Sequence, residues 1–365
     1  MSTVAGTGIL GLTDGIAATA QFHQPLDVAV SRSGVIYVAD TLNHVIRKIE
    51  NGRVTTLNKP SERTVEIFPG VVVPSGDFRD GVLSEALFNE PSGIAIDAKG
   101  NLYVADTGNQ RIRYIDLQAG TVTTVAGGGK PAGDALYVEG GFADGRAGDA
   151  RFNAPRGIEV TPDGGLLIAD SLNHVIRYLK DGIVRTVAGV PGESGKWDGV
   201  SRTALLSLPT DVKYVGNSAF VIADSGNNRI RIVRPYDVPP GLEGDAIEIV
   251  YNRTVLDSDA EPVIVGGTTF VPVRIISEEL GYTVDYEGEG VARLSLGDAW
   301  YRIRTGSTVV ESSFGNRELP QALFIRGGRL FLPVRFFAER MDLHVHWLND
   351  VRAVLIRNKQ TDLTY

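Results

Sequence analysis

The sequence predicts a mainly β protein: a four-bladed β-propeller closed by its N-terminal strand, followed by a small α+β domain with an internal two-fold repeat. Three observations support this fold class. A ten-residue block occurs four times, each copy lies among short strand-like segments separated by glycine turns, and a different repeat begins after residue 243. Similar blocks at nearly regular spacing indicate a repeat architecture.

The repeated block reads VADTLNHVIR from Val38, VADTGNQRIR from Val104, IADSLNHVIR from Ile168 and IADSGNNRIR from Ile222. Successive copies are 66, 64 and 54 residues apart. Each keeps an Asp, an Asn three residues after it and an Arg seven residues after it. These residues are Asp40, Asn43 and Arg47; Asp106, Asn109 and Arg113; Asp170, Asn173 and Arg177; and Asp224, Asn227 and Arg231.

Each block belongs to a longer unit that can be traced outward from its Asp. A proline stands fifteen residues before the Asp in all four copies (Pro25, Pro91, Pro155 and Pro209) and starts a first strand. A second strand ends at the Asp, a third carries the Arg, and a fourth follows a tight turn such as Asn51-Gly52. Four short antiparallel strands with glycine turns are typical of one propeller blade.

The fourth unit lacks its last strand, because the chain leaves after Val233. The segment Thr3 to Gly6 reads TVAG, like Thr124 to Gly127 and Thr186 to Gly189 in the fourth strands. We therefore expect residues 3–6 to pair with residues 229–233, which would close a four-bladed ring and remove its exposed edges. The alternative is an arc of a larger ring.

The links between units carry a second pattern. Asp-Gly pairs begin at Asp14, Asp80, Asp144 and Asp198. In a four-stranded meander these links and the Asp-Asn turns leave from the same end, so we expect them to crowd one face of the ring. Long loops on a rigid scaffold often carry binding. Two irregular insertions, Asn58 to Ser75 and Gly128 to Gly141, are further candidates, and the first is expected to form an apolar hairpin.

The combination of Asp-Gly, Phe-x-x-Pro and Tyr-Val-Ala-Asp-Thr-x-Asn-x-x-Ile-Arg resembles the NHL repeat over residues 3 to 233. The resemblance implies a propeller. Propellers of this type serve as protein-binding platforms, as RNA readers and occasionally as lyases or hydrolases, so the resemblance fixes the fold more closely than the function.

A proline-rich linker at residues 235–243 separates the repeats, residues 1–234, from a second part, residues 244–365. In the last part, Phe270 to Arg274 is answered 61 residues later by Phe331 to Arg335. Each copy precedes an apolar stripe with helical spacing: Val273, Ile276 and Leu280, and Val334, Phe337 and Met341. This pattern resembles the copper amine oxidase N-terminal-like domain, also called a stalk domain, over about residues 245 to 358.

That resemblance implies a non-catalytic module of secreted bacterial proteins. It does not imply copper binding or oxidase activity. The module would space, dimerise or attach the propeller, so we expect an extracellular or cell-surface protein. The N-terminal residues show no signal peptide, which is consistent with a leader that has been removed.

Composition excludes several classes of protein. The formal net charge of −8 disfavours binding to nucleic acid or to anionic membranes, which depends on clustered Lys and Arg. The sequence has no Cys, so it has neither disulfides nor thiolate chemistry. It has no run of 18 apolar residues that would span a bilayer.

The candidate binding residues are those that differ between units. Asp27, Arg156 and Asp211 follow the prolines on the strands expected to line the channel, and they would bind a small polar ligand or an ion, or simply form a wet lining. His44 and His174 occupy one position of the block, where the other copies have Gln and Asn. They could be metal ligands at the channel mouth or tolerated solvent-facing residues.

The repeated Asp residues also allow two interpretations. They could bind Ca²⁺ on the loop face, or each could accept hydrogen bonds from its own turn and pair with the Arg of the next strand. Because a residue present in every unit usually serves the unit, the structural role is preferred. Replacing Asp106 by Ala would then cost about 1 to 3 kcal/mol of stability.

The sequence as a whole favours a non-catalytic interaction scaffold, whose loop face binds a protein or saccharide partner. The alternative is a metal-dependent hydrolase or lyase with its site at the channel. No Ser-His-Asp constellation, nucleophile elbow or His-rich metal set supports the alternative.

Overall fold

The computed structural model describes residues 1–129, 135–199, 203–235, 239–240, 242, 246–288, 290–341, 343–348 and 351–358. The chain divides into two compact units, Met1–Pro235 (unit 1) and Tyr236–Tyr365 (unit 2). Most of the expected linker lies outside the described residues.

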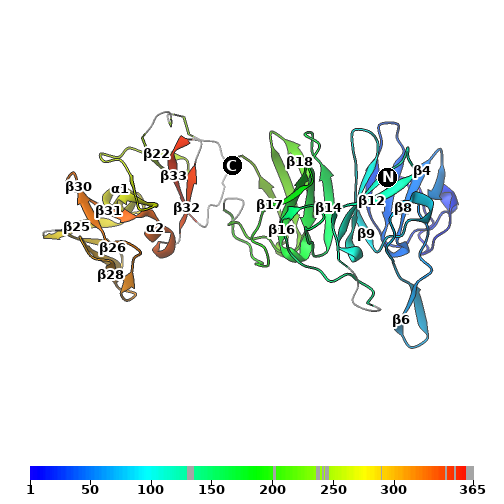
Figure 1. The fold of residues 1–365 in the computed structure, drawn as a ribbon, viewed down its shortest axis with the longest axis horizontal. Helices are drawn as coiled ribbons and strands as arrows, with labels where there is room; N and C mark the ends of the chain where they lie inside the picture. The colour runs from blue at the N-terminus through cyan, green and yellow to red at the C-terminus, as the bar shows by residue number, and fades with distance from the viewer. Residues whose placement is uncertain are drawn as a thin grey trace. The chain divides into compact units, whose positions relative to one another are not determined.

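The described residues of unit 1 form four antiparallel sheets of three to five strands, which we number as blades 1 to 4, and one separate two-stranded sheet (Figure 1). Blade 1 contains β1 (Gly15–Ile16), β5 (Arg53–Thr56), β4 (Val45–Glu50), β3 (Ile36–Asp40) and β2 (Pro25–Val30), from the outer edge inward. Blade 2 contains β8 (Gly81–Val82), β12 (Thr121–Gly127), β11 (Arg111–Asp116), β10 (Leu102–Asp106) and β9 (Pro91–Ile96). Blade 3 contains β13 (Gly145–Arg146), β17 (Ile183–Ala188), β16 (Val175–Lys180), β15 (Leu166–Asp170) and β14 (Pro155–Val160). Blade 4 contains β18 (Pro209–Gly216), β19 (Ala219–Asp224) and β20 (Arg229–Val233).

The strands follow from the local sequence. The outer hairpin of blade 1 turns at Asn51 and Gly52, both with positive φ (48° and 73°), as a two-residue hairpin turn requires. The Asp-Gly links add a short fifth strand to each of blades 1 to 3, which the sequence did not predict. Gly15, at the start of β1, has φ near 120°, a conformation that L side chains rarely adopt.

The inner strands β2, β9, β14 and β18 pack in sequence order, so the blades form a row. An apolar core fills each junction. Ala39 and Ile46 of blade 1 pack with Ile94 of blade 2, and Ala105 and Ile112 of blade 2 pack with Ile158 of blade 3. Ala169, Ile176 and Val212 repeat this arrangement between blades 3 and 4.

The expected closure of the ring by residues 3–6 is wrong in this structure. Within the described residues, β20 pairs with β19 alone, and blade 4 has three strands. Residues 3–6 instead lie against blade 1, where the Gly6 N–H donates to the Ala17 carbonyl at 2.9 Å. In the part of unit 1 that the structure describes, the row of blades therefore has two open ends.

The described residues of unit 2 form three sheets and two short helices around a core of their own (Figure 1). The first sheet contains β22 (Thr254–Leu256), β21 (Glu248–Tyr251), β33 (Ala353–Asn358) and β32 (Leu343–Leu348). The second contains β23 (Val263–Val265), β24 (Thr268–Pro272), β31 (Arg329–Pro333) and β30 (Phe324–Arg326). The third contains β25 (Thr283–Gly288), β26 (Val291–Leu296), β27 (Ala299–Arg304), β28 (Val309–Ser312) and β29 (Arg317–Glu318).

The helices α1 (Val273–Glu279) and α2 (Val334–Arg340) each begin directly after a proline that ends a strand, as expected. Their predicted apolar stripes face the core, where Ile276 and Phe337 are fully buried. The two strands before them, β24 and β31, pair antiparallel with each other.

Candidate binding surface

Each repeated Asp is the centre of a buried cluster that holds its blade together. One carboxylate oxygen of Asp106 accepts a hydrogen bond from the Asn89 N–H at 2.7 Å. The other accepts from Asn109 Nδ2 at 2.9 Å and from Arg113 Nη1 at 2.5 Å. The same set recurs around Asp40, Asp170 and Asp224. The predicted pairing of Asp with Arg is confirmed, but the backbone donor precedes the inner strand and is not in the Asp's own turn.

The arginine of the cluster also binds the link between blades. Arg113 reaches Asp80 of the Asp-Gly pair at 2.7 Å and donates to the Leu87 and Arg79 carbonyls. Its guanidinium lies over the Phe88 ring, 4.7 Å from the centroid, where a cation–π contact adds to the charge pairing. The repeated carboxylates are thus occupied by an arginine and an asparagine.

Burial raises the pKa of two of these carboxyl groups. Desolvation dominates for Asp106 and Asp170, and it raises the pKa of Asp170 to about 6. Arg113 and Arg177 act in the opposite direction by stabilising the charged forms.

The expected loop face is present. In each blade the Asn of the block donates from Nδ2 to a carbonyl of the link that precedes the blade, at 2.7 to 3.0 Å. The acceptors are Gly11, Asp77, Gly141 and Gly195. The Asp-Asn turns and the Asp-Gly links therefore lie on one end of unit 1, which we call the loop face.

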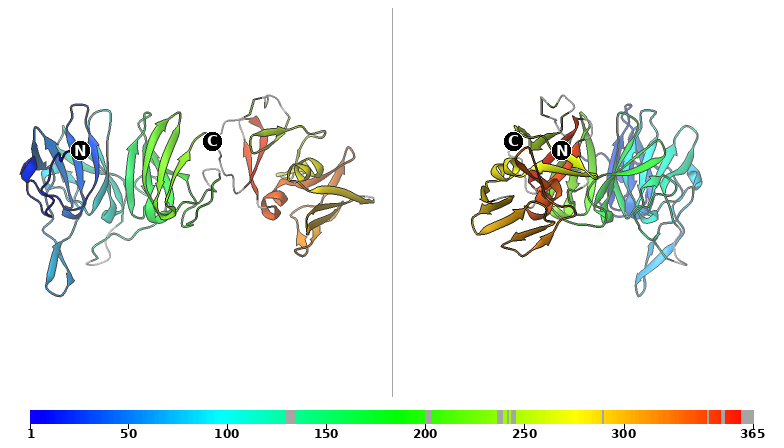
Figure 2. Two further views of the ribbon diagram at one scale, coloured as in Figure 1. Left: turned by 180° about the vertical axis from the view of Figure 1, so that it is seen from behind. Right: turned by 60° about the vertical axis from the view of Figure 1, so that its left-hand side comes forward.

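The first insertion forms a hairpin of β6 (Thr64–Phe68) and β7 (Val71–Pro74) that pairs with no other strand among the described residues. Figures 1 and 2 show that it projects away from the blades. Its apolar side chains are exposed, including Ile67, Val72 and Phe68, which is 67% exposed. The expected apolar hairpin is confirmed.

The second insertion, described from residue 135 onward, meets the first on the loop face. Arg63 Nη2 at the base of the hairpin donates to the Ala135 carbonyl at 3.0 Å. Val138 is buried, whereas Tyr137 is half exposed and donates to Glu90 at 2.7 Å. This hydrogen bond, with some burial, raises the pKa of Tyr137 to about 12.

Two of the three candidate channel residues lie close together. Asp27 and Asp211 sit on the inner strands of blades 1 and 4, and the basic group near them is Lys213. Burial raises the pKa of Asp27, which Lys213 partly offsets. Lys213 pairs with Glu159 at 3.2 Å, whereas Arg156 is exposed. Binding of a small polar ligand at this cluster stays a prediction.

His44 and His174 are not tolerated polar residues without a partner, although His174 is only partly buried. His44 is buried, and its Nδ1 accepts a hydrogen bond from the Glu90 N–H of blade 2 at 3.0 Å. His174 Nδ1 accepts in the same way from the Leu208 N–H of blade 4 at 3.1 Å. Burial lowers the pKa of His44. The two histidines serve two different junctions between blades.

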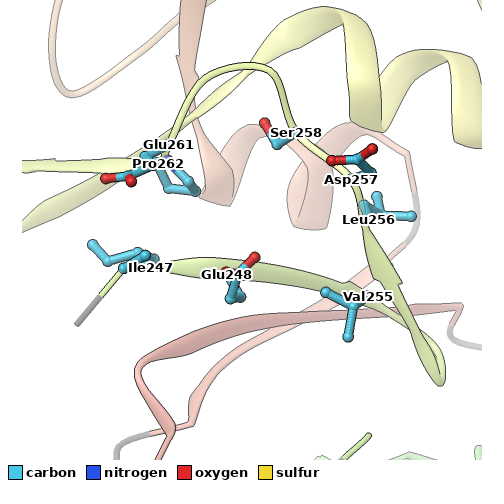
Figure 3. Close-up of a pocket in the computed structure, with 9 residues that line it drawn as sticks. Ile247, Glu248, Val255, Leu256, Asp257, Ser258, Glu261 and Pro262 are labelled. Atoms are coloured by element: carbon cyan, nitrogen blue, oxygen red, sulfur yellow. The ribbon is translucent and has the colours of Figure 1, made fainter. Parts of the chain in front are cut away.

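Unit 2 has a cavity of about 330 Å³ between β21 and the segment that follows β22 (Figure 3). Three carboxylates, Glu248, Asp257 and Glu261, line it together with Ser258. The remaining lining residues are Ala246, Ile247, Val255, Leu256 and Pro262. Among the described residues of the whole chain, no three His, Asp or Glu side chains are grouped so that they could hold a metal ion.

Several of these contacts were missed from the sequence although a signal existed. Lys213 stands two residues after Asp211 on one strand, so strand alternation places both on the same face. Each Asp-Gly aspartate precedes its arginine by 33 residues, a constant spacing that indicates a contact. Tyr137 was not singled out, because the sequence marked the whole insertion from Gly128 to Gly141 as a candidate and no pattern distinguished one residue within it.

Comparison with known families matches two different parts of the chain. The NHL repeat matches residues 22–49 and 88–113, and the copper amine oxidase N-terminal domain matches residues 250–356. The chain therefore carries NHL repeats followed by a copper amine oxidase N-terminal domain. Within the described residues, no helix combines the length and apolar character needed to cross a membrane.

Similar proteins include the chloroplastic protein SUPPRESSOR OF QUENCHING 1 of Arabidopsis thaliana, 28% identical over 284 residues, with 63% of this chain and 27% of that protein covered. NHL repeat-containing protein 2 of Homo sapiens is 28% identical over 258 residues, with 62% and 33% covered. The chain thus spans about a third or less of the length of these relatives.

Among solved structures, an auxiliary nutrient binding protein of Bacteroides ovatus aligns with a TM-score of 0.34 and 16% identity, covering 65% of this chain and 76% of that one. Virginiamycin B lyase of Staphylococcus aureus aligns with a TM-score of 0.36 and 13% identity, covering 93% and 85%.

Proposed function

We propose that this protein is a non-catalytic binding scaffold whose loop face holds a protein partner. The convergence of the two insertions on that face carries the proposal. They place an isolated hairpin with exposed apolar side chains beside Tyr137, on a rigid support of packed blades.

The physical argument rests on the hairpin. An isolated two-stranded hairpin is marginally stable in water. Ile67, Phe68 and Val72 are exposed, and contact of their apolar surface with water is unfavourable. A protein partner would cover these side chains and order the hairpin at the same time. Exposed apolar patches with polar rims are typical of protein interaction sites.

Unit 2 would serve as a spacer or attachment module in this scaffold. Its match to the copper amine oxidase N-terminal domain supports that role. We also propose that the scaffold lies outside the cell or at its surface. In this proposal the two halves of unit 2, each with a strand, a proline and a helix, are copies of one motif.

Site-specific photo-crosslinking of the full chain tests the proposal. A photoreactive amino acid at Phe68 should give a discrete protein adduct in an envelope extract of the source cells. The same amino acid at Val82, an exposed apolar position on the outer edge of blade 2, should not.

The identified partner is then purified and titrated against three proteins. Changing Phe68 and Val72 together to Ser should weaken binding about tenfold or more, since burying two such side chains is worth at least about 1.4 kcal/mol. Val82→Ser should bind like the wild type. Equal affinity of all three proteins, or an adduct at Val82 alone, would contradict the loop-face proposal.

A further inference from the structure

The open end of blade 1 exposes a residue that is buried in every other blade. Val28 on β2 is 56% exposed. Its counterparts three residues after the proline are Ile94 at 2%, Ile158 at 0% and Val212 at 1%. Each counterpart is covered by the preceding blade. The surface around Gln24, Pro25 and Val28, which we call the blade-1 face, has the residues to receive a blade, and no blade among the described residues covers it.

The open end of blade 4 shows the converse. Ile230 on β20 is 77% exposed, whereas its counterparts Ile46, Ile112 and Ile176 are each 0% exposed. In the other blades this isoleucine packs on the residue equivalent to Val28 of the following blade. We call the surface around Ser225, Asn228 and Ile230 the blade-4 face.

One kind of hydrogen bond between blades runs in the same direction at every junction along the row. At each junction a side chain of one blade accepts the N–H of the residue before the proline in the next. The acceptors are His44 Nδ1, Gln110 Oε1 and His174 Nδ1, and the donors are Glu90, Ala154 and Leu208. The three donors have φ between 48° and 53°.

The two open faces carry one half of this contact each. Asn228, an amide with an acceptor oxygen, occupies the acceptor position on the blade-4 face. Gln24 occupies the donor position on the blade-1 face and has φ of 54°, like the three donors. A second such pair is the hydroxyl after the Asp: Thr41 Oγ1 donates to the Pro91 carbonyl at 2.8 Å. Ser225 and Pro25 occupy the equivalent positions on the open faces, where the Ser225 hydroxyl contacts Thr210 Oγ1 instead.

Residues 3–6 form no strand here, but Gly6 has the contact that the outer strand of a preceding blade would make. The Gly127 N–H at the end of β12 in blade 2 donates to the Ala147 carbonyl of blade 3 at 2.9 Å. The Gly6 N–H makes the equivalent contact to Ala17 of blade 1, also at 2.9 Å. Blade 1 therefore holds, in residues 3–6, a loose strand-like segment that forms no ladder of its own, and blade 4 is the blade that lacks an outer strand.

We propose that blade 4 of one copy of this chain docks on the blade-1 face of a second copy. Ile230 of the first copy covers Val28 of the second, and Asn228 accepts the Gln24 N–H. The edge of β20 pairs with residues 3–6 of the second copy, a strand addition of the kind that sheet edges favour. The contact is heterologous, head to tail, so it generates a closed ring or a longer chain of copies.

A second copy of the chain can cover both the blade-1 face and the blade-4 face, because the two faces complement each other and every copy carries both. The same chain does not satisfy them in this structure, where Val28 and Ile230 are both open. The proposed contact uses neither the hairpin nor Tyr137, so it is independent of the proposed function.

Sedimentation of the full chain over a concentration series tests the proposal. The wild type should show masses above the monomer that rise with concentration. Ile230→Asp and Val28→Asp should each sediment as monomers, because a carboxylate at either position would be buried without a partner. Val82→Asp, which places the same charge at an exposed apolar site away from both ends, should associate like the wild type.

Mixing the two monomeric variants distinguishes a head-to-tail contact from a symmetric one. Ile230→Asp keeps its blade-1 face and Val28→Asp keeps its blade-4 face, so an equimolar mixture should form a one-to-one heterodimer. Val4→Pro, which removes a backbone donor from the loose strand-like segment, should weaken association of the otherwise unchanged chain.

Because Val28 and Ile230 are exposed in the single chain, both Asp variants should keep the wild-type circular dichroism spectrum and unfolding temperature when monomeric. A wild type that stays monomeric at every concentration overturns the proposal. Self-association of either single variant also overturns it, since one intact face would then suffice.

Discussion

At the residue scale, His44 shows how the junction between blades depends on a hydrogen-bond acceptor. The position is His, Gln, His and Asn in the four blades, and each of these side chains can accept a hydrogen bond. In the first three blades that acceptor binds a backbone N–H of the next blade. His44 must be neutral at Nδ1 to do so.

Replacing His44 by Gln should remove a pH-dependent part of the stability. Burial lowers the pKa of His44 below its ordinary 6.5 in the folded protein. From about pH 6.5 down to the lowered value, the unfolded chain binds a proton that the folded chain does not, so the free energy of unfolding falls as pH falls. His44→Gln keeps the acceptor, as Gln110 does, without the titration.

Thermal unfolding of both proteins between about pH 7.5 and about pH 5.5 measures this effect. The wild type should lose more stability over the range than His44→Gln, and the two should be similar at the upper end. The same pH dependence in both proteins would show that His44 does not titrate in the unfolding transition.

Asp106→Ala should lower the free energy of unfolding by about 3 to 5 kcal/mol, because it leaves Arg113 buried without its closest carboxylate. This exceeds the cost of about 1 to 3 kcal/mol expected from lost hydrogen bonds alone. Asp149→Ala removes an exposed carboxylate and should change stability by no more than about 0.5 kcal/mol. Urea denaturation of the two variants checks both values, and similar small losses would contradict a fastening role for Asp106.

At the element scale, the sequence predicted those features that spacing determines. The strand from each proline, the strand that ends at each Asp and the crowding of turns on the loop face follow from constant offsets. Offsets within one unit identify local partners. The curvature of the whole row determines which units meet at their ends. The spacing of residues within one unit does not determine that curvature.

The closure of the ring failed for this reason. Residues 3–6, with the TVAG pattern, form no strand in this structure, although Gly6 makes the contact that an outer strand makes with the following blade. The pattern does not tell which blade supplies the other neighbour. Likewise, the burial of His44 could not be predicted, because His, Gln and Asn are equally typical of exposed turns.

At the scale of the whole molecule, the two units have separate apolar cores. The core of unit 2 runs from Ile249 to Ile356 and includes no residue of the blades. The three cores at the junctions of unit 1 likewise contain only residues of the blades and the links between them. Elements that share no core are expected to unfold as separate cooperative units.

Phe337→Ala tests this separation. The side chain is fully buried in the core of unit 2, so the change should lower the stability of that unit by about 3 to 5 kcal/mol. Calorimetry of the wild type should resolve two transitions, of which the variant shifts only one to lower temperature. Asp106→Ala should shift only the other, so the two variants serve as each other's control. A single transition that both variants move would mean that the units unfold together.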